Sequence, residues 1–429
     1  MRIIYLTHRF LPEHFRGTEV WTFELAQAMQ ARGNEVLVVS IRELPKPDKI
    51  FVVWEQYSGL PVAKICKHLT PENFEGYFFD PEMDKNWLEI INDFKPDLVH
   101  STYFLGGLSL GMTQAVLARV PLFITITDYS EICARGQLLD RDFKPCAGPK
   151  GGIRCIYCLF GRNWIFSNQI LDKWAREYLP QEISLLKLPD ELKLAKKRNQ
   201  AVSEILNNAK AVFFSHPYTA KVFRNHRLKI KNSKIMDFGI NFEPFLAHKK
   251  SISNRLRIGF IGQLLPHKGL HILVEALSKI KEQDSFELSI YGSISSSEEK
   301  RYFESLGLER IKHCRWLGVF DYHLMNSVLE GIDLLVVPSL WAENCPLVPK
   351  YALITGAWLL LSDAPGILAK TEGEGIIFFK MGQPDLLREK IEWLIKEELW
   401  KKPLKPKPEL LVSIQEQAGW LEKIYQEGI

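Results

Sequence analysis

Short apolar runs alternate with longer amphipathic segments along this chain, and that alternation restricts the fold more than any other feature of the sequence. In the first half the runs are rich in β-branched residues, are bounded by Pro, Gly or Asp, and occupy residues 3–7, 35–40, 97–101, 122–127, 211–215 and 234–237. Residues 18–32 carry apolar side chains at helical spacing between two of these runs. Strands that alternate with helices are typical of stacked βαβ units, so the sequence predicts an α/β fold with mostly parallel sheets.

The alternation stops at a polar stretch near residues 247–254 and then restarts, which indicates two domains. The second series has strand-like runs at residues 256–261, 286–291, 334–337 and 358–361, with a helical segment at 270–280. A chain of 429 residues is also too long for one small core. We therefore predict a domain at 1–245 with an insertion at about 130–200, a linker at 246–254, a second domain at 255–410 and a final helical segment at 411–429.

Charge, hydropathy and cysteine content narrow the class of protein. The 55 Lys and Arg residues nearly balance the 51 Asp and Glu residues, and the formal net charge of +4 excludes the strong field of a dedicated nucleic-acid binder. No segment approaches the ~20 apolar residues of a membrane-spanning helix, and the N-terminal residues lack the pattern of a secretory signal. Seven cysteines, an odd number in a large chain, argue against a disulfide framework. We expect a cytoplasmic protein with reduced thiols.

Three strand-to-helix loops carry residues suited to an anionic ligand, because ligands of open α/β sheets bind beyond the carboxyl ends of the strands. The first loop leads from the strand at 3–7 to Gly17 and Thr18. A glycine lets the backbone approach a ligand closely, and the start of a helix offers free N–H groups to an anion. A tight turn that ends in a threonine cap is an equally good interpretation. No Gly-x-Gly-x-x-Gly motif follows any strand, which argues against NAD or FAD.

The second loop opens the second domain directly after its first strand and reads IGQLLPHKG at residues 261–269. Gly262 permits a tight turn, and Pro266 stiffens it. Lys268 stands where its ammonium group can reach a diphosphate. Considered alone, Lys268 is equally well explained as a solvated loop lysine.

The third loop lies between a strand and a helix and reads PSLWAENCPLV at residues 338–348. The Glu343 carboxylate can accept hydrogen bonds from hydroxyl groups, while the amides of Leu347 and Val348 at the helix start can bind phosphate oxygens. One loop would then hold both a sugar and a phosphate. The alternative is that Glu343 only interacts with the helix dipole.

In order and spacing, these loops closely resemble the motifs of glycosyltransferase family 4, as do D-F-G-I-N at residues 237–241 and a final helix that ends in Ile424 and Tyr425. The resemblance covers essentially the whole chain. It implies the GT-B architecture, in which two Rossmann-like domains face a cleft and a C-terminal helix returns to the N-terminal domain. It also implies that the second domain binds a nucleoside-diphosphate sugar and the first binds the acceptor. Transfer in the family retains the anomeric configuration and needs no metal.

The resemblance assigns roles to individual residues. Gly17 and Thr18 match the glycine-rich loop beneath the donor phosphates and sugar. Gln263 and Lys268 match the basic pair that clamps the diphosphate, and Glu343 matches the first carboxylate of the Glu-x7-Glu motif near the transferred sugar. The implied chemistry is loss of a diphosphate from the anomeric carbon, with the developing charge neutralised by Lys268 and the helix amides. The predicted donor-binding set is Gly17, Thr18, Gly262, Gln263, Lys268, Glu343, Leu347, Val348 and Tyr351.

Three positions depart from the family's pattern. The ribose-binding second carboxylate of Glu-x7-Glu falls on Tyr351, the strand-end histidine falls on Thr127 beside a retained Asp128, and a Gly-Gly-x-x-Glu motif is replaced by a segment that ends at Ala369. Loss of one such contact can lower a rate on the order of a hundredfold or more, although a tyrosine can still hydrogen-bond a ribose.

Two hypotheses about function follow. The first is a retaining glycosyltransferase, with catalytic residues Asp128, Glu343 and Lys268, that extends a polysaccharide or glycoconjugate using a glycan or lipid-linked acceptor. The alternative is a catalytically impaired GT-B-like protein that binds a glycan or a partner enzyme. Neither hypothesis requires a cofactor for catalysis or a nucleic-acid partner.

Four cysteines, Cys133, Cys146, Cys155 and Cys158, lie in a Gly-rich segment of the expected insertion. Four thiols that end in Cys-x-x-Cys suit a tetrahedral structural zinc ion. Reduced thiols packed in a loop, or a disulfide, are the alternatives. A subset of the family is similar, with a cysteine-bearing insertion directly after the strand end that here carries Asp128. The zinc would fold the acceptor-side loop.

An aromatic stretch at residues 164–179 precedes a basic run made of Lys193, Lys196, Lys197 and Arg198. Together they could contact an anionic membrane that carries a lipid-linked acceptor, which would make the protein peripheral at the inner membrane face. A helix core with a solvated basic face is the more common meaning of such a pattern.

Overall fold

The computed structural model describes the chain except for residues 46, 48, 70–73, 141–142, 150–154, 156–157, 159–189, 227, 229, 246–250, 369–372 and 403. The chain forms two compact units. The first unit comprises Met1–Met236 and Ala418–Ile429, and the second comprises Asp237–Gln417. Residues 246–250 of the expected linker, most of the expected insertion, the aromatic stretch at 164–179 and Ala369 lie outside the described residues.

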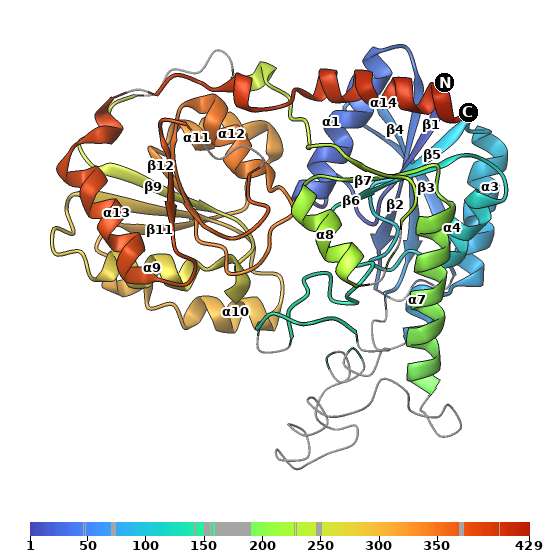
Figure 1. Ribbon diagram of the computed structural model, residues 1–429, viewed down its shortest axis with the longest axis horizontal. Helices are drawn as coiled ribbons and strands as arrows, with labels where there is room; N and C mark the ends of the chain where they lie inside the picture. The colour runs from blue at the N-terminus through green and yellow to red at the C-terminus, as the bar shows by residue number, and fades with distance from the viewer. Residues whose placement is uncertain are drawn as a thin grey trace. The chain divides into compact units, whose positions relative to one another are not determined.

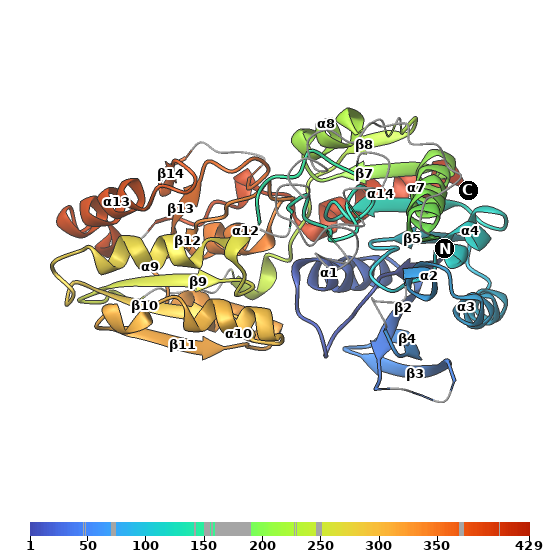
Figure 2. The ribbon, with the colours of Figure 1, turned by 90° about the horizontal axis from the view of Figure 1, so that it is seen from below.

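The first unit is built on an eight-stranded sheet (Figure 1). Its strands are β1 (Arg2–Leu6), β2 (Glu35–Glu43), β3 (Phe51–Tyr57), β4 (Leu60–Lys67), β5 (Leu98–Ser101), β6 (Leu122–Ile126), β7 (Ala211–Phe214) and β8 (Ser233–Ile235), in the spatial order β3-β4-β2-β1-β5-β6-β7-β8. Only β3 runs antiparallel to its neighbour, as the edge hairpin with β4 (Figure 2). The central strands are buried on both faces, because helices cover both faces of a parallel sheet.

The helices of the first unit connect these strands. They are α1 (Gly17–Ala31), α2 (Phe74–Phe78), α3 (Pro81–Phe94), α4 (Leu110–Leu117), α7 (Asp190–Asn208) and α8 (Pro217–Asn225). Sequence signals set their ends: Asp80 caps α3 by accepting a hydrogen bond from the Met83 amide, and Pro81 occupies the first turn. Helices α3 and α4 pack together, as do α4 and α7.

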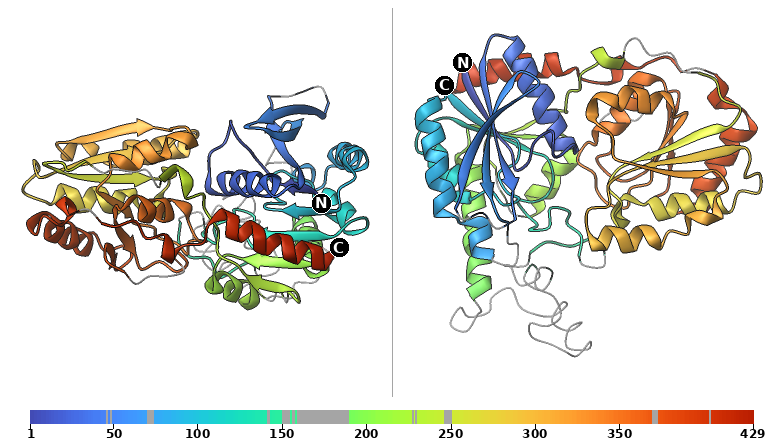
Figure 3. Two further views of the ribbon diagram at one scale, coloured as in Figure 1. Left: turned by 90° about the horizontal axis from the view of Figure 1, so that it is seen from above. Right: turned by 180° about the vertical axis from the view of Figure 1, so that it is seen from behind.

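The C-terminal helix α14 (Ile414–Gly428) places its last turns against the first unit, beside α1 (Figure 3). Glu422 accepts hydrogen bonds from Arg32, at the end of α1, with distances of 2.6 and 2.8 Å. Tyr425 is fully buried, and its hydroxyl contacts His100 and lies 3.4 Å from the Tyr5 hydroxyl. The predicted return of the final helix to the N-terminal domain is confirmed.

The second unit contains a six-stranded, fully parallel sheet. Its strands are β9 (Leu256–Ile261), β10 (Phe286–Tyr291), β11 (Cys314–Gly318), β12 (Leu334–Val337), β13 (Trp358–Ser362) and β14 (Ile376–Phe379), in the spatial order β11-β10-β9-β12-β13-β14. Its helices are α9 (Leu270–Ser278), α10 (Ser297–Glu304), α11 (Met325–Glu330), α12 (Leu347–Thr355) and α13 (Pro384–Lys396). Helices α9 and α13 pack on one face of the sheet, and α11 and α12 pack on the other (Figure 1).

The predicted fold class, α/β with two mostly parallel sheets, is therefore confirmed. Within the described residues no helix combines the length and the apolar character that a membrane crossing requires.

Candidate active site

In the second unit, Lys268 and Glu343 form an ion pair at the carboxyl ends of adjacent strands. Strands β9 and β12 are neighbours in the sheet, so the loops that follow them lie together. The Lys268 ammonium nitrogen lies 2.8 Å from Glu343 Oε1 and 3.1 Å from Oε2. Glu343 is buried, whereas the Lys268 side chain is 21% exposed. The cation is thus the accessible member of the pair.

Neighbouring side chains hold this pair in one geometry. The Ser339 hydroxyl donates a hydrogen bond of 2.5 Å to Glu343 Oε1, and the Lys268 ammonium lies 5.0 Å from the centre of the Trp341 ring. Burial alone would raise the pKa of Glu343, but Lys268, Ser339 and Trp341 together lower it below its usual value. The carboxylate is therefore ionised at neutral pH and able to accept hydrogen bonds.

Two glycines make the close approach of these loops feasible. Gly269 has a φ of +75°, and a Cβ there would stand 1.8 Å from the Pro338 carbonyl oxygen. Gly366 has a φ of +80°, and a Cβ there would stand 2.1 Å from the Glu343 carbonyl oxygen. Any larger residue would meet backbone at both positions, so the loops that carry Lys268 and Glu343 depend on these glycines.

The start of α12 adds hydrogen-bond donors next to Glu343. Pro346 occupies the N-cap position, and no side chain caps the helix. The first amides, including those of Leu347 and Val348, precede the intrahelical hydrogen bonds and can receive an anion. In the loop after β9, the Gly262 amide donates a hydrogen bond of 3.0 Å to the carbonyl of Tyr291, at the end of the neighbouring strand β10. The next residue, Gln263, is half-buried.

Tyr351, which replaces the expected second carboxylate, lies one turn into α12 and is 1% exposed. Its ring stacks on Phe245 with the ring centres 5.1 Å apart. The preceding Lys350 is also buried and binds Asp237 Oδ1 at 2.6 Å and the Phe238 carbonyl at 2.5 Å. These contacts fix α12 to the segment that begins the second unit.

In the first unit, α1 begins at the predicted loop. Arg16 at the N-cap has an extended backbone and no capping side-chain hydrogen bond. The amides of Gly17 and Thr18 therefore lie in the first turn, where intrahelical partners are lacking. Gly17 is exposed and Thr18 is half-buried, so both are accessible to a ligand.

A row of polar side chains crosses the carboxyl ends of β1, β5 and β6. Glu19 is fully buried in the first turn of α1, and its Oε1 lies 3.6 Å from His8 Nε2. The His8 ring packs on Tyr103 with the centres 4.1 Å apart, and the Tyr103 hydroxyl donates to Asp128 Oδ2 at 3.0 Å. Within the described residues, neither Glu19 oxygen has a hydrogen-bond partner in another residue.

Burial controls the charge of this row. It lowers the pKa of His8, and it raises the pKa of Glu19 and Asp128. The contact between His8 and Glu19 is therefore not a full ion pair. Thr127, at the position of the family's histidine, donates its hydroxyl to the Thr102 carbonyl at 3.2 Å. His8, which follows β1, places an imidazole beside Glu19 and Tyr103.

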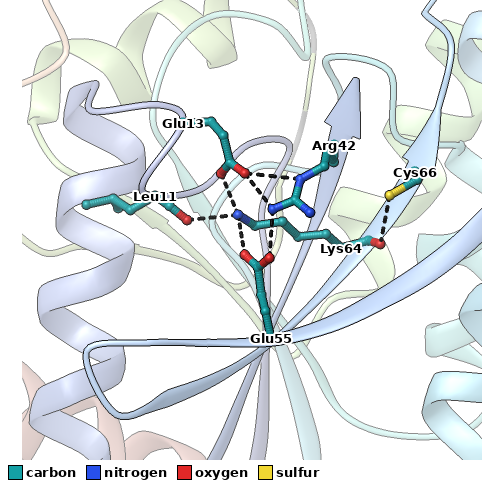
Figure 4. Close-up of polar contacts among 6 residues, drawn as sticks. All are labelled: Leu11, Glu13, Arg42, Glu55, Lys64 and Cys66. Atoms are coloured by element: carbon teal, nitrogen blue, oxygen red, sulfur yellow. Dashed lines mark hydrogen bonds and ion pairs between the residues drawn. The ribbon is translucent and has the colours of Figure 1, made fainter. Parts of the chain in front are cut away.

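A charge network anchors the loop between β1 and α1 (Figure 4). Lys64, on β4, is 1% exposed, and its ammonium binds the Leu11 carbonyl at 3.0 Å and the Glu13 carboxylate. It also lies 2.5 Å from Glu55 on β3, and Arg42 on β2 binds both carboxylates. The network thus ties the loop that precedes Gly17 to three strands of the sheet edge.

The four cysteines of the predicted zinc site lie near one another. Cys133 is buried and the other three are half-buried. Burial, and then the thiols of Cys133, Cys146 and Cys158, raise the pKa of Cys155 to about 12 despite the nearby Arg198. Among the residues that the structure describes, no three His, Cys, Asp or Glu side chains form a group with metal-binding geometry. The zinc site stays a prediction.

The basic run on α7 is divided between surface and core. Lys193, Lys196 and Lys197 are exposed, but Arg198 is 2% exposed and donates to the Ser130 carbonyl. The expectation that all four residues form one basic surface is therefore wrong for Arg198. A helix turns about 100° per residue, so Lys193, Lys196 and Lys197 share one face and Arg198 lies beyond its edge, toward the core.

Comparison with known families identifies the chain. Residues 15–132 match the family described as Glycosyltransferase Family 4, and residues 243–409 match Glycosyl transferases group 1. The chain belongs to glycosyltransferase family 4. This is a family of retaining glycosyltransferases that use nucleotide-sugar donors, so the predicted resemblance is confirmed.

Two relatives of similar sequence extend over most of the chain. An uncharacterized 42.6 kDa protein in the cps region of Klebsiella pneumoniae is 22% identical over 385 residues, which cover 86% of each chain. An uncharacterized glycosyltransferase of Methanocaldococcus jannaschii is 23% identical over 388 residues, which cover 88% of this chain and 84% of that protein. A granule-bound starch synthase of Pisum sativum is 30% identical, but over 32% of this chain and 22% of that protein.

Solved structures establish the GT-B fold. Sucrose-phosphate synthase from Thermosynechococcus elongatus superposes with a TM-score of 0.70 at 16% identity, covering 99% of this chain and 98% of that one. HepE from Anabaena, in complex with UDP and glucose, superposes with a TM-score of 0.61 at 14% identity, covering 100% of this chain and 98% of that one. The predicted GT-B architecture is confirmed as a fold.

Several residues at these strand ends were not predicted. Ser339 and Trp341 precede Glu343 in the same loop, and their proximity in the sequence was an available signal. His8 and Glu19 flank the loop that contains Gly17, but nothing in the sequence marks their contact. Lys64 interrupts an apolar strand, and a lysine in such a position signals a buried ion pair.

Proposed function

We propose that this chain transfers a sugar from a nucleoside-diphosphate sugar to a glycan or lipid-linked acceptor, with retention of configuration, in the biosynthesis of a polysaccharide or glycoconjugate. The observation that carries the proposal is the Lys268–Glu343 pair beside the uncapped start of α12. The relative from the cps region of Klebsiella pneumoniae supports a role in polysaccharide synthesis. The UDP and glucose in the HepE complex support the donor class.

The contacts of the second unit suggest how the donor is held. Lys268 exchanges Glu343 for a diphosphate oxygen, and the amides of Leu347 and Val348 bind further oxygens. The released Glu343 carboxylate accepts a hydrogen bond from a sugar hydroxyl. Fixed donors of this kind neutralise the charge that develops on the leaving diphosphate, so the proposal requires no metal for catalysis.

The first unit would supply the acceptor side. Asp128 receives hydrogen bonds from the Tyr103 hydroxyl and the Ser130 amide and is the proposed acceptor-side carboxylate. Gly17 and Thr18 offer the first amides of α1 to the donor phosphates. The buried Glu19, without a hydrogen-bond partner among the described residues, is a further group that a sugar hydroxyl could satisfy.

Release of nucleoside diphosphate from a panel of UDP-, GDP- and ADP-sugars tests the proposal. We expect turnover with at least one donor, and a loss on the order of a hundredfold for Glu343→Gln, which keeps the shape but not the charge. Glu416→Gln is a matched control, because Glu416 is exposed and hydrogen-bonds to Ser413 at the start of α14. Equal turnover by wild type and Glu343→Gln would contradict the role of Glu343.

A second candidate function is a GT-B-like protein that binds donor or glycan without transfer. The burial of Tyr351 against Phe245 and the engagement of Thr127 by Thr102 favour it, because neither side chain replaces the charge that the family carries. Donor binding without release of nucleoside diphosphate, in the presence of any acceptor tried, would support this function.

Two further predictions accompany the proposal. A structural zinc ion bound by Cys133, Cys146, Cys155 and Cys158 would be detected by metal analysis, and Cys155→Ser with Cys158→Ser should lower the zinc content without changing donor affinity. If the protein purified from zinc-supplemented medium contains no zinc, the four cysteines do not form a zinc site. The cytoplasmic location also stays a prediction, made from the sequence alone.

A further inference from the structure

The edge of the first sheet at α8 and β8 carries positive charge that no carboxylate of the described residues pairs with. Between residues 210 and 234 the sequence has seven Lys and Arg residues and no Asp or Glu. Within the described part of the chain, five of these cations are exposed and form no ion pair, namely Lys210, Lys221, Arg224, Lys231 and Lys234. Elsewhere in the described chain some exposed cations, such as Lys279 and Lys312, are paired with carboxylates.

A pocket opens in the same place, and both polar and apolar atoms line it. Its volume is about 220 Å³, and its lining comprises five apolar residues and two polar ones: Phe214, Ala220, Phe223, Leu228, Ile230, Arg224 and Ser233. Helix α8 packs against both β7 and β8, so the pocket lies at the junction of these elements. The neighbouring Ile235 is 51% exposed. Cationic and apolar groups are therefore combined on one surface.

We propose that this α8–β8 surface, made of Lys221, Arg224, Lys231, Lys234, Ile235 and the pocket, binds an anionic phospholipid bilayer. The cations attract negatively charged headgroups, and the pocket and Ile235 accept hydrocarbon from the headgroup boundary. An acidic polysaccharide or a nucleic acid would satisfy the cations but leave the apolar groups in water, so a bilayer fits the surface better.

The proposal concerns a surface of the first unit and uses none of the residues assigned to donor or acceptor. It also differs from the surface that the sequence suggested, because Arg198 of α7 faces the core. A Lys or Arg near an anionic membrane strengthens binding about fivefold. Three cations together are therefore worth on the order of a hundredfold, and the effect weakens as salt increases.

Sedimentation of the full chain with lipid vesicles tests the proposal. The vesicles contain phosphatidylcholine alone or phosphatidylcholine mixed with phosphatidylglycerol. The test variant carries Lys221→Glu, Lys231→Glu and Lys234→Glu. The control variant carries Lys193→Glu, Lys196→Glu and Lys197→Glu, which make the same change of charge on exposed residues of α7.

We expect wild type to bind only the vesicles with phosphatidylglycerol, the α8–β8 variant to bind on the order of a hundredfold more weakly, and the α7 variant to bind within a few-fold of wild type. Leu228→Asn, which alters the pocket but not the charge, should weaken binding about tenfold. Donor binding should be unchanged in all three variants, so a failure here is distinct from a failure of the proposed function.

Three results would overturn the proposal: no binding of wild type to anionic vesicles, equal losses for the two charge variants, or unchanged binding by Leu228→Asn. Tighter binding of wild type to an acidic polysaccharide such as alginate than to the anionic vesicles would assign the surface to that class of partner instead. Circular dichroism and the thermal midpoint of each variant establish that it is folded.

Discussion

The loops after β9 and β12 in the second unit and the loops after β1, β5 and β6 in the first unit both carry charged groups, but they satisfy them differently. Both oxygens of Glu343 are bound by Lys268, and one also accepts from Ser339. The equally buried Glu19 has neither oxygen hydrogen-bonded to another described residue, and its contact with His8 is 3.6 Å long. Burial would raise the pKa of both carboxyl groups, but Lys268, Ser339 and Trp341 lower that of Glu343 below its usual value, whereas the pKa of Glu19 stays raised.

This difference indicates two kinds of site. The second unit holds a preorganised ion pair whose cation is accessible, which suits a ligand of fixed chemistry such as a diphosphate. The first unit holds buried polar groups that are only partly satisfied, at a cost in stability that native proteins accept mainly where the groups have a function. Substitutions at the site in the second unit should therefore lower both stability and function. Substitutions of the buried polar groups in the first unit should lower function without lowering stability.

Lys268→Ala should have the largest effect. It removes the cation for the diphosphate and leaves Glu343 buried without its partner, so donor affinity should fall about a hundredfold and the unfolding free energy by about 3 kcal/mol. Calorimetry and urea unfolding measure the two effects. Lys268→Arg keeps the charge and should lose less donor affinity and less unfolding free energy. If Lys268→Ala is as stable as wild type, the ion pair with Glu343 does not stabilise the fold.

The pH dependence of the unfolding free energy of Lys268→Ala also tests whether Lys268 stabilises the buried Glu343 carboxylate. The lowered pKa of Glu343 gives wild type a stability that is fully present above the ordinary glutamate pKa and is lost as the pH falls through the lower folded value. Without Lys268 the folded pKa should rise. The stability difference between wild type and Lys268→Ala should therefore shrink as the medium becomes acidic, and a constant difference would exclude this explanation.

Gly366→Ala should have the next largest effect. The new Cβ would meet the Glu343 carbonyl at 2.1 Å in a left-handed backbone, so we expect a loss of about 3 kcal/mol and weaker donor binding. Gly318→Ala is a matched control, because Gly318 has a φ of +71° but no atom within 4 Å of an added Cβ. It should lose about 1 kcal/mol. Similar losses in urea unfolding would mean that the loop tolerates the contact.

Lys64→Met tests the charge network that holds the loop between β1 and α1. Glu13 and Glu55 would lose their shared cation but stay partly exposed, so we expect a loss of about 2 kcal/mol, less than for Lys268→Ala. Arg2→Met removes an exposed pair with Glu35 and should lose at most about 1 kcal/mol. If the two variants unfold at the same urea concentration, the network does not stabilise the loop before Gly17.

Glu19→Gln should have the smallest effect on stability, and of the opposite sign. A raised folded pKa favours the native state below the ordinary glutamate pKa and loses that contribution as the pH rises through the folded value. The neutral glutamine avoids this loss, so the variant should be more stable than wild type by about 1 kcal/mol at neutral pH. Transfer should nevertheless fall. If Glu19→Gln is less stable than wild type and fully active, Glu19 is a structural residue and does not contact the substrate.

The sequence predicted the buried parallel strands better than the sheet edge. The runs at 256–261, 286–291 and 334–337 coincide with β9, β10 and β12, because these strands are mostly apolar and are buried in the interior of the sheet. The hairpin of β3 and β4 was missed, since β3 is an edge strand with alternating exposure. Its stability depends on Lys64 and its partners, which meet only in the folded sheet.

The sequence also predicted some residues of the candidate site and missed the contacts around them. Lys268 and Glu343 were singled out because each lies in a strand-to-helix loop and matches a motif of the family. That β9 and β12 are adjacent, which brings the two loops together, is known only from the structure. The contacts of Trp341 and Ser339 with Lys268 and Glu343 depend on side-chain direction within one loop, which spacing does not specify. The burial of Tyr351 on Phe245 could not be predicted, because it depends on the docking of the short segment before β9 against α12.

Isothermal titration of the wild-type chain with UDP-, GDP- and ADP-sugars tests whether Lys268 and the start of α12 hold the diphosphate of a nucleotide sugar. We expect saturable binding of at least one donor, with a dissociation constant between about 1 μM and 1 mM, and an affinity about a hundredfold lower for Lys268→Ala. Absence of binding to every donor, or equal binding by wild type and Lys268→Ala, would contradict this mode of donor binding.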